Sequence, residues 1–211
     1  MRSLWTIGLL LGASLVAGCD RSDAGAGSDI ATSPAPATAP AGMTKYIYQA
    51  ADGGPHILLP DELRGAWRGG NGISTSADYA RAGKVTGSFG LIPVGSGQGL
   101  VLAGSPGMAA IARRSDGRGA DVIVLESWTS DNLDALIDES LAALPTEKLT
   151  DTKKTLTITA SGATLIFAGD RPGNTAYGEE RIKLEPGTYA LHEGRHKSNM
   201  GELVLCRLVK Q

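Results

Sequence analysis

Short apolar segments, each bounded by glycine, proline or other turn-forming residues, recur from residue 46 almost to the C-terminus. Several alternate apolar and polar residues with period two, which is the pattern of a half-buried β-strand. Others are apolar on both faces, as a strand in the centre of a covered sheet requires. The segments predicted as strands are 46–49, 56–59, 89–94, 99–102, 120–128, 155–159, 164–167, 181–185, 188–191 and 203–209. We therefore expect residues 44–211 to form a single domain built mainly from antiparallel sheet.

One segment has the period of a helix instead. Leucine or isoleucine recurs at positions 133, 136, 137, 141 and 144, which places all five on one stripe of an α-helix. The stripe predicts an amphipathic helix over about 131–144, capped by Ser130 or Asp131 and stopped by Pro145. Helical turns are also predicted at 60–63 and 78–82. The predicted fold class is α+β: mainly antiparallel sheet, with one substantial amphipathic helix and one or two short helical turns.

The N-terminus has the ordered features of a bacterial export signal. Arg2 precedes an apolar run over 4–17, which is shorter than the roughly 20 residues that span a membrane. The run ends in Val16-Ala17-Gly18-Cys19, which resembles the lipobox of bacterial lipoproteins. This resemblance implies cleavage of a 1–18 signal peptide and lipidation of Cys19. Ordinary secretion, with Cys19 incidental, is the alternative.

A segment without core-forming residues follows the signal. Residues 19–43 are rich in Pro, Ala and Gly, with Ile30 as their one large aliphatic residue before Met43. They predict a disordered tether with a reach of roughly 25–30 Å. The resemblance to lipoproteins then implies a domain held on the periplasmic side of the cell envelope by lipid on Cys19. Asp20 slightly favours the inner membrane, because enterobacterial lipoproteins with Asp at this position are retained there.

Charge and cysteine content narrow the function further. The chain has 20 Lys and Arg against 22 Asp and Glu, without a basic run. Nucleic-acid affinity comes mainly from clustered cations on phosphates, so no nucleic-acid partner is expected. If Cys19 carries lipid, Cys206 has no cysteine left to pair with. Cys206 lies in an apolar run, which predicts a buried, unreactive thiol.

One motif resembles a metal site. His192-Glu193-Gly194-Arg195-His196 has the H-E-x-x-H spacing of zinc metalloproteases, and Glu202 follows where one branch places a third ligand. That chemistry needs a helix, in which side chains four residues apart lie about 5–6 Å from each other. The surrounding pattern predicts a strand, where they lie about 13 Å apart. We therefore expect a hairpin with two exposed histidines near its tip, no metal, no cofactor and no catalytic residue.

Tryptophans are candidates for either a core or an interface. Trp128 follows a predicted buried strand and is expected in the core. Trp67 lies between Arg64 and Arg68 and before Gly69-Gly70, a setting that suits a core or an interface equally.

A set of short motifs resembles a known family in its order. The motifs are Asp52-Gly53-Gly54-Pro55, Leu58-Leu59-Pro60, Trp67-Arg68-Gly69, Asp78-Tyr79-Ala80-Arg81-Ala82, Ile92-Pro93-Val94-Gly95, Leu100-Val101-Leu102 and Pro186-Gly187-Thr188-Tyr189-Ala190. Together they resemble the immunity protein 21 family of bacterial polymorphic toxin systems. This chain departs from the family in its export signal, and in Gly83, where some members have cysteine.

The resemblance implies a non-enzymatic protein that binds and neutralises a cognate secreted effector toxin. With the lipobox, it predicts a membrane-anchored periplasmic immunity protein that meets an antibacterial effector there. The weak net charge argues against a nuclease as the target and favours a toxin that acts on cell wall, lipid or membrane. Candidate toxin-binding residues are Trp67, Arg68, Tyr79 and Arg81. Two alternatives stay open: a zinc-dependent lipoprotein hydrolase using His192, His196 and Glu202, and a generic envelope binding or assembly lipoprotein.

Overall fold

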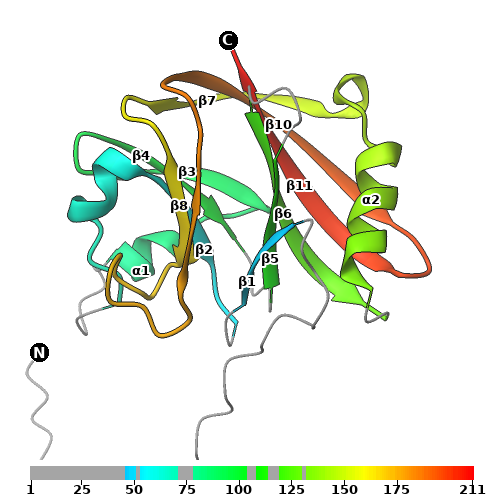
Figure 1. Ribbon diagram of the computed structural model, residues 1–211, viewed down its shortest axis with the longest axis horizontal. Helices are drawn as coiled ribbons and strands as arrows, with labels where there is room; N and C mark the ends of the chain where they lie inside the picture. Colours follow the sequence, from blue (N-terminus) through cyan, green and yellow to red (C-terminus); the bar gives the residue numbers. More distant parts are fainter. Residues whose placement is uncertain (1–45, 51–52, 71–77, 104–107, 114–118, 130–131) are drawn as a thin grey trace, which may run out of the picture. The chain divides into compact units, whose positions relative to one another are not determined.

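Two antiparallel sheets form the part of the chain that a computed structural model describes, residues 46–50, 53–70, 78–103, 108–113, 119–129 and 132–211 (Figure 1). The six-stranded sheet has the order β1 (Ile47–Ala50), β5 (Met108–Arg113), β6 (Gly119–Trp128), β11 (Gly201–Lys210), β10 (Gly187–Lys197) and β7 (Thr150–Ile158). The five-stranded sheet has the order β3 (Phe89–Val94), β4 (Gly97–Leu102), β2 (His56–Pro60), β8 (Ala163–Phe167) and β9 (Glu179–Ile182). The prediction of mainly antiparallel sheet with one substantial helix is confirmed, and helices are few enough that the domain is mostly β.

The six-stranded sheet is covered on both faces. Val122 and Val124 of β6 lie in the core between the two sheets, together with Cys206 of β11. Ile123 and Leu125, which alternate with them, lie in a second core beneath helix α2 (Leu133–Ala143). This double burial explains why Val122-Ile123-Val124-Leu125 is apolar at every position, as the middle of a central strand should be.

Helix α2 buries the predicted stripe against the outer face of this sheet (Figure 1). Its N-terminal cap differs from the prediction, because Asn132 accepts the backbone N–H of Ala135 at 3.1 Å through Oδ1. An amide oxygen at this position satisfies a free helix N–H as a hydroxyl or carboxylate does, so the helix begins later than expected. Ser130 and Asp131 lie outside the described residues. The helix ends at Ala143, before Pro145.

Short helices cover the outer face of the five-stranded sheet and one end of α2. The predicted turns at 60–63 and 78–82 are confirmed as the 3₁₀-helix η1 (Asp61–Ala66) and helix α1 (Asp78–Ala82). They close a third core, which contains Ile57, Leu59 and Trp67. A further 3₁₀-helix, η2 (Thr146–Lys148), follows α2.

Several predictions concern the N-terminal segment. The 1–18 signal peptide, the 19–43 tether, Cys19 and Asp20 all lie outside the described residues. Within the described ranges, no helix combines the length and the apolar composition needed to cross a bilayer.

A buried histidine lies at the start of β2. The His56 side chain is 0% exposed and meets the Phe167 ring edge-on, with 6.3 Å between ring centroids. Neither ring nitrogen has a hydrogen-bond partner among the described residues. Loss of hydration disfavours the charged form, so burial lowers the pKa of His56 from 6.5 to about 4.

This histidine makes the domain sensitive to acid. Between pH 6.5 and 4 the unfolded chain binds a proton at His56 that the folded protein excludes, so stability falls as pH falls through this window. We expect a loss of about 2 kcal/mol between pH 7 and 5 from this group alone. Urea unfolding at both pH values should show that His56→Leu removes this loss. The same substitution at the half-buried His192 is the control, and an equal effect there would contradict the assignment.

Candidate interaction surface

Trp67 anchors the Trp-Arg-Gly motif from inside the domain. Its side chain is 0% exposed, and its indole Nε1 donates to the Asp170 carbonyl oxygen at 3.1 Å. Gly69 follows with φ +66°, and a Cβ there would lie 2.4 Å from the same carbonyl oxygen. The motif therefore needs glycine for close backbone approach. The closing of the third core removes the ring of Trp67, a predicted toxin-contact residue, from the surface of the folded domain.

Two of the other three predicted contact residues, Arg68 and Arg81, bind the buried carboxylate of Asp78. Asp78, the first residue of α1, accepts the Arg68 backbone N–H through Oδ2 and pairs with the Arg81 guanidinium through Oδ1. Arg81 also donates to the Pro93 carbonyl oxygen at 2.9 Å. Arg68 is exposed, and Tyr79 is half-buried against the Phe167 ring. The structure thus brings Arg68 and Arg81 together, and contacts with Asp78 and Pro93 already use part of the hydrogen-bonding capacity of the Arg81 guanidinium.

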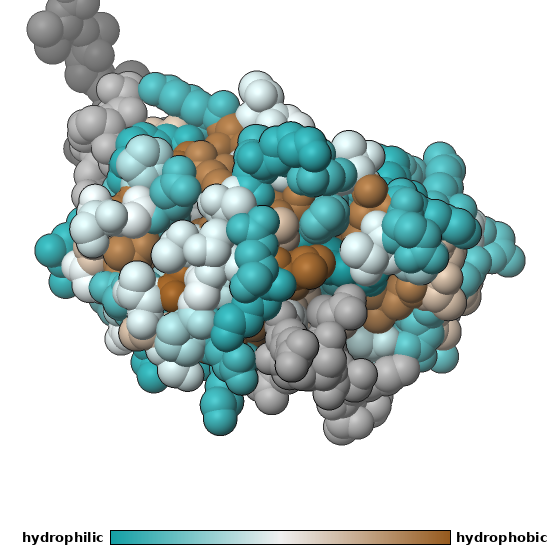
Figure 2. Space-filling view, turned by 90° about the horizontal axis from the view of Figure 1, so that it is seen from above, coloured by the Kyte–Doolittle hydropathy of each residue, from teal (hydrophilic) through white to brown (hydrophobic). Residues whose placement is uncertain are grey.

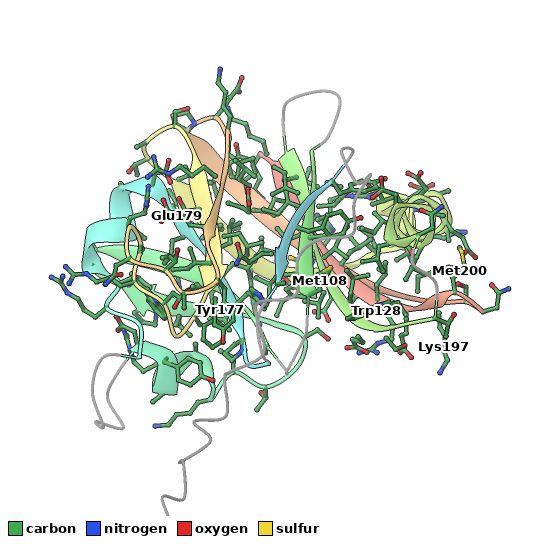
Figure 3. The ribbon with its side chains drawn as sticks, turned by 60° about the horizontal axis from the view of Figure 1, so that its bottom comes forward. Met108, Trp128, Tyr177, Glu179, Lys197 and Met200 are labelled. Atoms are coloured by element: carbon green, nitrogen blue, oxygen red, sulfur yellow. The ribbon has the colours of Figure 1, made fainter. Side chains whose placement is uncertain are left out.

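Trp128 occupies the opposite kind of environment from the one predicted. It ends β6, pairs with Gly201 and is 40% exposed, so the expectation of a core tryptophan is wrong. Figure 3 shows it with Lys197 and Met200 where β6 ends and the β10–β11 hairpin turns. The apolar pattern of β6 does not show where the covering layers stop, and Trp128 lies beyond them.

The H-E-x-x-H motif lies on a strand, as predicted. His192 and His196 both belong to β10, where they pair with Arg207 and Leu203 of β11. Side chains four residues apart on a strand are about 13 Å apart, too far to share one zinc ion. Among the described residues, no three His, Cys, Asp or Glu side chains are grouped as a metal ion requires. Both histidines are half-buried, which corrects the expectation that they are exposed.

The predicted third ligand, Glu202, belongs to an ion-pair cluster instead. Arg195 Nη1 lies 2.6 Å from Glu202 Oε1, and Arg195 Nη2 lies 3.0 Å from Glu126 Oε1. Lys197 Nζ is 3.3 Å from the other Glu202 oxygen. These cations hold the pKa of the Glu202 carboxyl below its usual value, mainly through the hydrogen bond from Arg195.

An open groove runs between the two sheets at β7. Its larger hollow has a volume of about 560 Å³ and is lined by Lys84, Val85, Thr86, Gly90, Leu91, Gln98, Lys154 and Thr155. A second hollow of about 350 Å³ is lined by Thr150, Thr152, Glu193, Gly194 and Arg195. A narrow cavity, which we call the neck, shares Lys154 and Gly90 with the first hollow, and Thr152 and Glu193 with the second. We call these lining residues the inter-sheet groove.

The β7 side of the domain is turned toward the viewer in Figure 2. Apolar surface shows there between hydrophilic side chains. Non-obligate protein interfaces are about as apolar as the rest of a protein surface, so a mixed surface of this kind suits one without marking it.

A bulge in β7 shapes the floor of the inter-sheet groove. Ala190 of β10 pairs with Thr155, but His192 pairs with Asp151. Between these two pairs β7 has two more residues than β10. The extra residues widen the edge strand locally, as β-bulges do near binding sites and exposed sheet edges.

Hydrogen bonds hold the bulge in place. The Thr152 hydroxyl donates to the Leu191 carbonyl oxygen at 2.7 Å and accepts the Lys154 backbone N–H at 3.3 Å. Lys153, between them, has φ 60°, a conformation that is uncommon for residues other than glycine. The result is that Thr152 and Lys154 both line the groove.

The neck of the groove ends on the second cysteine. Cys206 is 1% exposed, and burial raises the pKa of its thiol far above the ordinary value. A thiol that stays protonated is a poor nucleophile, so the prediction of a buried, unreactive Cys206 is confirmed.

The comparisons with known proteins give one match. The family model of immunity protein 21 matches residues 48–201, more than half of the chain. The chain belongs to the immunity protein 21 family. No curated protein and no solved structure matches it.

The range matched by the immunity protein 21 family covers most of the described domain. The matched range contains helix α1, the strand with the histidines and the lining residues of both hollows of the inter-sheet groove. Immunity proteins bind cognate toxins, so the family indicates a binding protein and not an enzyme. Sequence reasoning missed the groove residues Lys84 and Lys154. The available signal was the Lys153-Lys154 pair, which interrupts the alternation of the edge strand.

Proposed function

We propose that this immunity protein 21 family member is a lipid-anchored periplasmic protein that neutralises a cognate antibacterial effector toxin by binding it. The observation that carries the proposal is the family match over residues 48–201. The compartment is supported by the short apolar run that ends in Val16-Ala17-Gly18-Cys19. Lipid on Cys19 would hold the domain close to the membrane, where a toxin acting on cell wall, lipid or membrane would arrive.

The surface supports inhibition by occlusion. The inter-sheet groove is large enough to receive side chains of a partner, and the ion-pair cluster around Arg195 lies at its second hollow. Arginine is frequent among interface residues that dominate binding energy. Tyr79 and Arg81 belong to helix α1, which ends shortly before segment 84–86, and this segment lines the first hollow.

Binding and protection can be tested separately. The full-length protein should bind the purified product of the adjacent toxin gene with a dissociation constant below about 1 µM, or about −8 kcal/mol. Cells that receive this toxin in the periplasm should survive only when they make the immunity protein. Deleting residues 1–18 should abolish protection and leave the affinity for the purified toxin unchanged. An adjacent gene product that neither binds nor kills would contradict the proposal and favour a general envelope-binding lipoprotein.

A further inference from the structure

Two lysines line the larger hollow of the inter-sheet groove, and among the described residues neither has an ion-pair partner. The two are Lys84 and Lys154, and the lining contains no Asp or Glu. By contrast Lys153 pairs with Asp151 at 2.7 Å, and Lys210 pairs with Glu185 at 2.8 Å. Positive charge is therefore concentrated in this hollow although the chain as a whole is acidic by two charges.

Both lysines are held by backbone structure, on two different segments that form walls of the hollow. On one wall, the Lys84 backbone N–H donates to the Arg81 carbonyl oxygen at 3.2 Å, which extends the last turn of α1. The next residue, Val85, lies so close to Gly90 of β3 that a Cβ there would be 2.4 Å from Val85 Cγ1. The absence of a Cβ at Gly90 thus lets Val85 pack directly against β3, which holds the 84–86 segment there. On the other wall, the β7 bulge positions Lys154.

The remaining lining suits a hydrated anionic group. Thr86, Gln98 and Thr155 contribute polar side chains between the two lysines' walls. A carboxylate entering the hollow would gain charge-assisted hydrogen bonds, which are shorter and stronger than neutral ones. Two cations that share one hollow also repel each other until an anion enters.

We infer that this hollow is the toxin-contacting subsite for an acidic loop of the partner, with Lys84 and Lys154 binding its aspartate or glutamate side chains. The inference rests on the proposed function and adds the chemistry of the partner. It commits to an acidic protein segment because a nucleic acid would meet an overall negative protein and no extended basic surface.

Charge reversal with a matched control tests the inference. Lys84→Glu with Lys154→Glu should weaken the affinity for the adjacent toxin at least tenfold. The control is Lys148→Glu with Lys183→Glu, which changes the net charge equally at two exposed lysines outside the hollow. The control pair should stay within twofold of the wild type. Equal losses in both pairs would reduce the effect to general electrostatics and overturn the inference.

A probe that does not depend on the toxin separates this inference from the proposed function. In ¹H–¹⁵N NMR spectra of the full-length protein in non-ionic detergent, hexaglutamate should shift the amides of Lys84, Thr86, Gln98 and Thr155, and hexalysine should not. Shifts spread equally to Lys183 would overturn the acidic subsite. A wild-type protein that binds hexaglutamate in the hollow but does not bind the toxin would overturn the proposed function alone.

Discussion

Replacing Trp67 by alanine is expected to lower the free energy of unfolding by about 3–5 kcal/mol. The indole is fully buried in the core closed by η1 and α1, so alanine at this position would leave a cavity. Its Nε1 also donates to the Asp170 carbonyl oxygen, which would lose this partner. Urea unfolding followed by far-ultraviolet circular dichroism measures the change without using tryptophan emission.

Trp128→Ala is the matched control for this substitution. The same side chain is removed from a position that is 40% exposed, so the expected cost is about 1 kcal/mol or less. Equal costs at the two positions would contradict the burial of Trp67. The comparison also matters for function, because loss of protection by a Trp67 variant would report unfolding and not a lost toxin contact.

Breaking the buried Arg207–Asp121 pair is expected to cost about 3–5 kcal/mol. The two side chains are each 6% exposed, with Arg207 Nε 2.6 Å from Asp121 Oδ1 and Nη2 3.2 Å from Oδ2. Arg207 Nη1 also donates to the Thr146 hydroxyl at 3.0 Å. Asp121→Ala removes the carboxylate and leaves the Arg207 guanidinium buried with the Thr146 hydroxyl as a neutral acceptor. Urea unfolding at pH 7 measures the resulting loss in the free energy of unfolding.

A double variant separates the charge from the volume it occupies. Asp121→Leu with Arg207→Met removes both charges together. This double variant should be more stable than Asp121→Leu alone or Arg207→Met alone, each of which leaves one buried charge without its partner. If the double variant loses as much as the sum of the single ones, the cost comes from side-chain volume and not from an unpaired buried charge.

The local pattern of apolar and polar residues predicted the secondary structure correctly wherever a segment has the same kind of environment along its whole length. The stripe at 133–144 predicted α2 within a few residues, because an amphipathic helix needs only one apolar layer beneath it. Strands β3 and β4 were predicted from two short apolar runs and are confirmed, and the structure pairs them as an antiparallel hairpin. The strand assignment of His192 and His196 also followed from local alternation, which is why the zinc geometry does not form.

Pairing between distant segments could not be predicted from the sequence. Segments 46–49 and 56–59 are separated by a turn cluster, yet β1 joins β5 in one sheet and β2 joins β4 and β8 in the other. Strand β5, Met-Ala-Ala-Ile-Ala-Arg, was missed because alanine favours helices. Its alanines are buried against α2 and between the sheets, where small side chains let the layers approach. Tertiary contacts override weak propensity in such a strand.

The sequence by itself determined the periods of its segments, the one long helix, the apolar setting of Cys206 and the resemblance to immunity protein 21. The tertiary structure alone decided which tryptophan is buried, which carboxylate neutralises each cation, and that Lys84 and Lys154 line the same hollow. The physical reason is the distance along the chain between the residues that interact. Periodicity follows from backbone geometry within a few residues, whereas burial and charge pairing depend on which distant layer lies above each side chain.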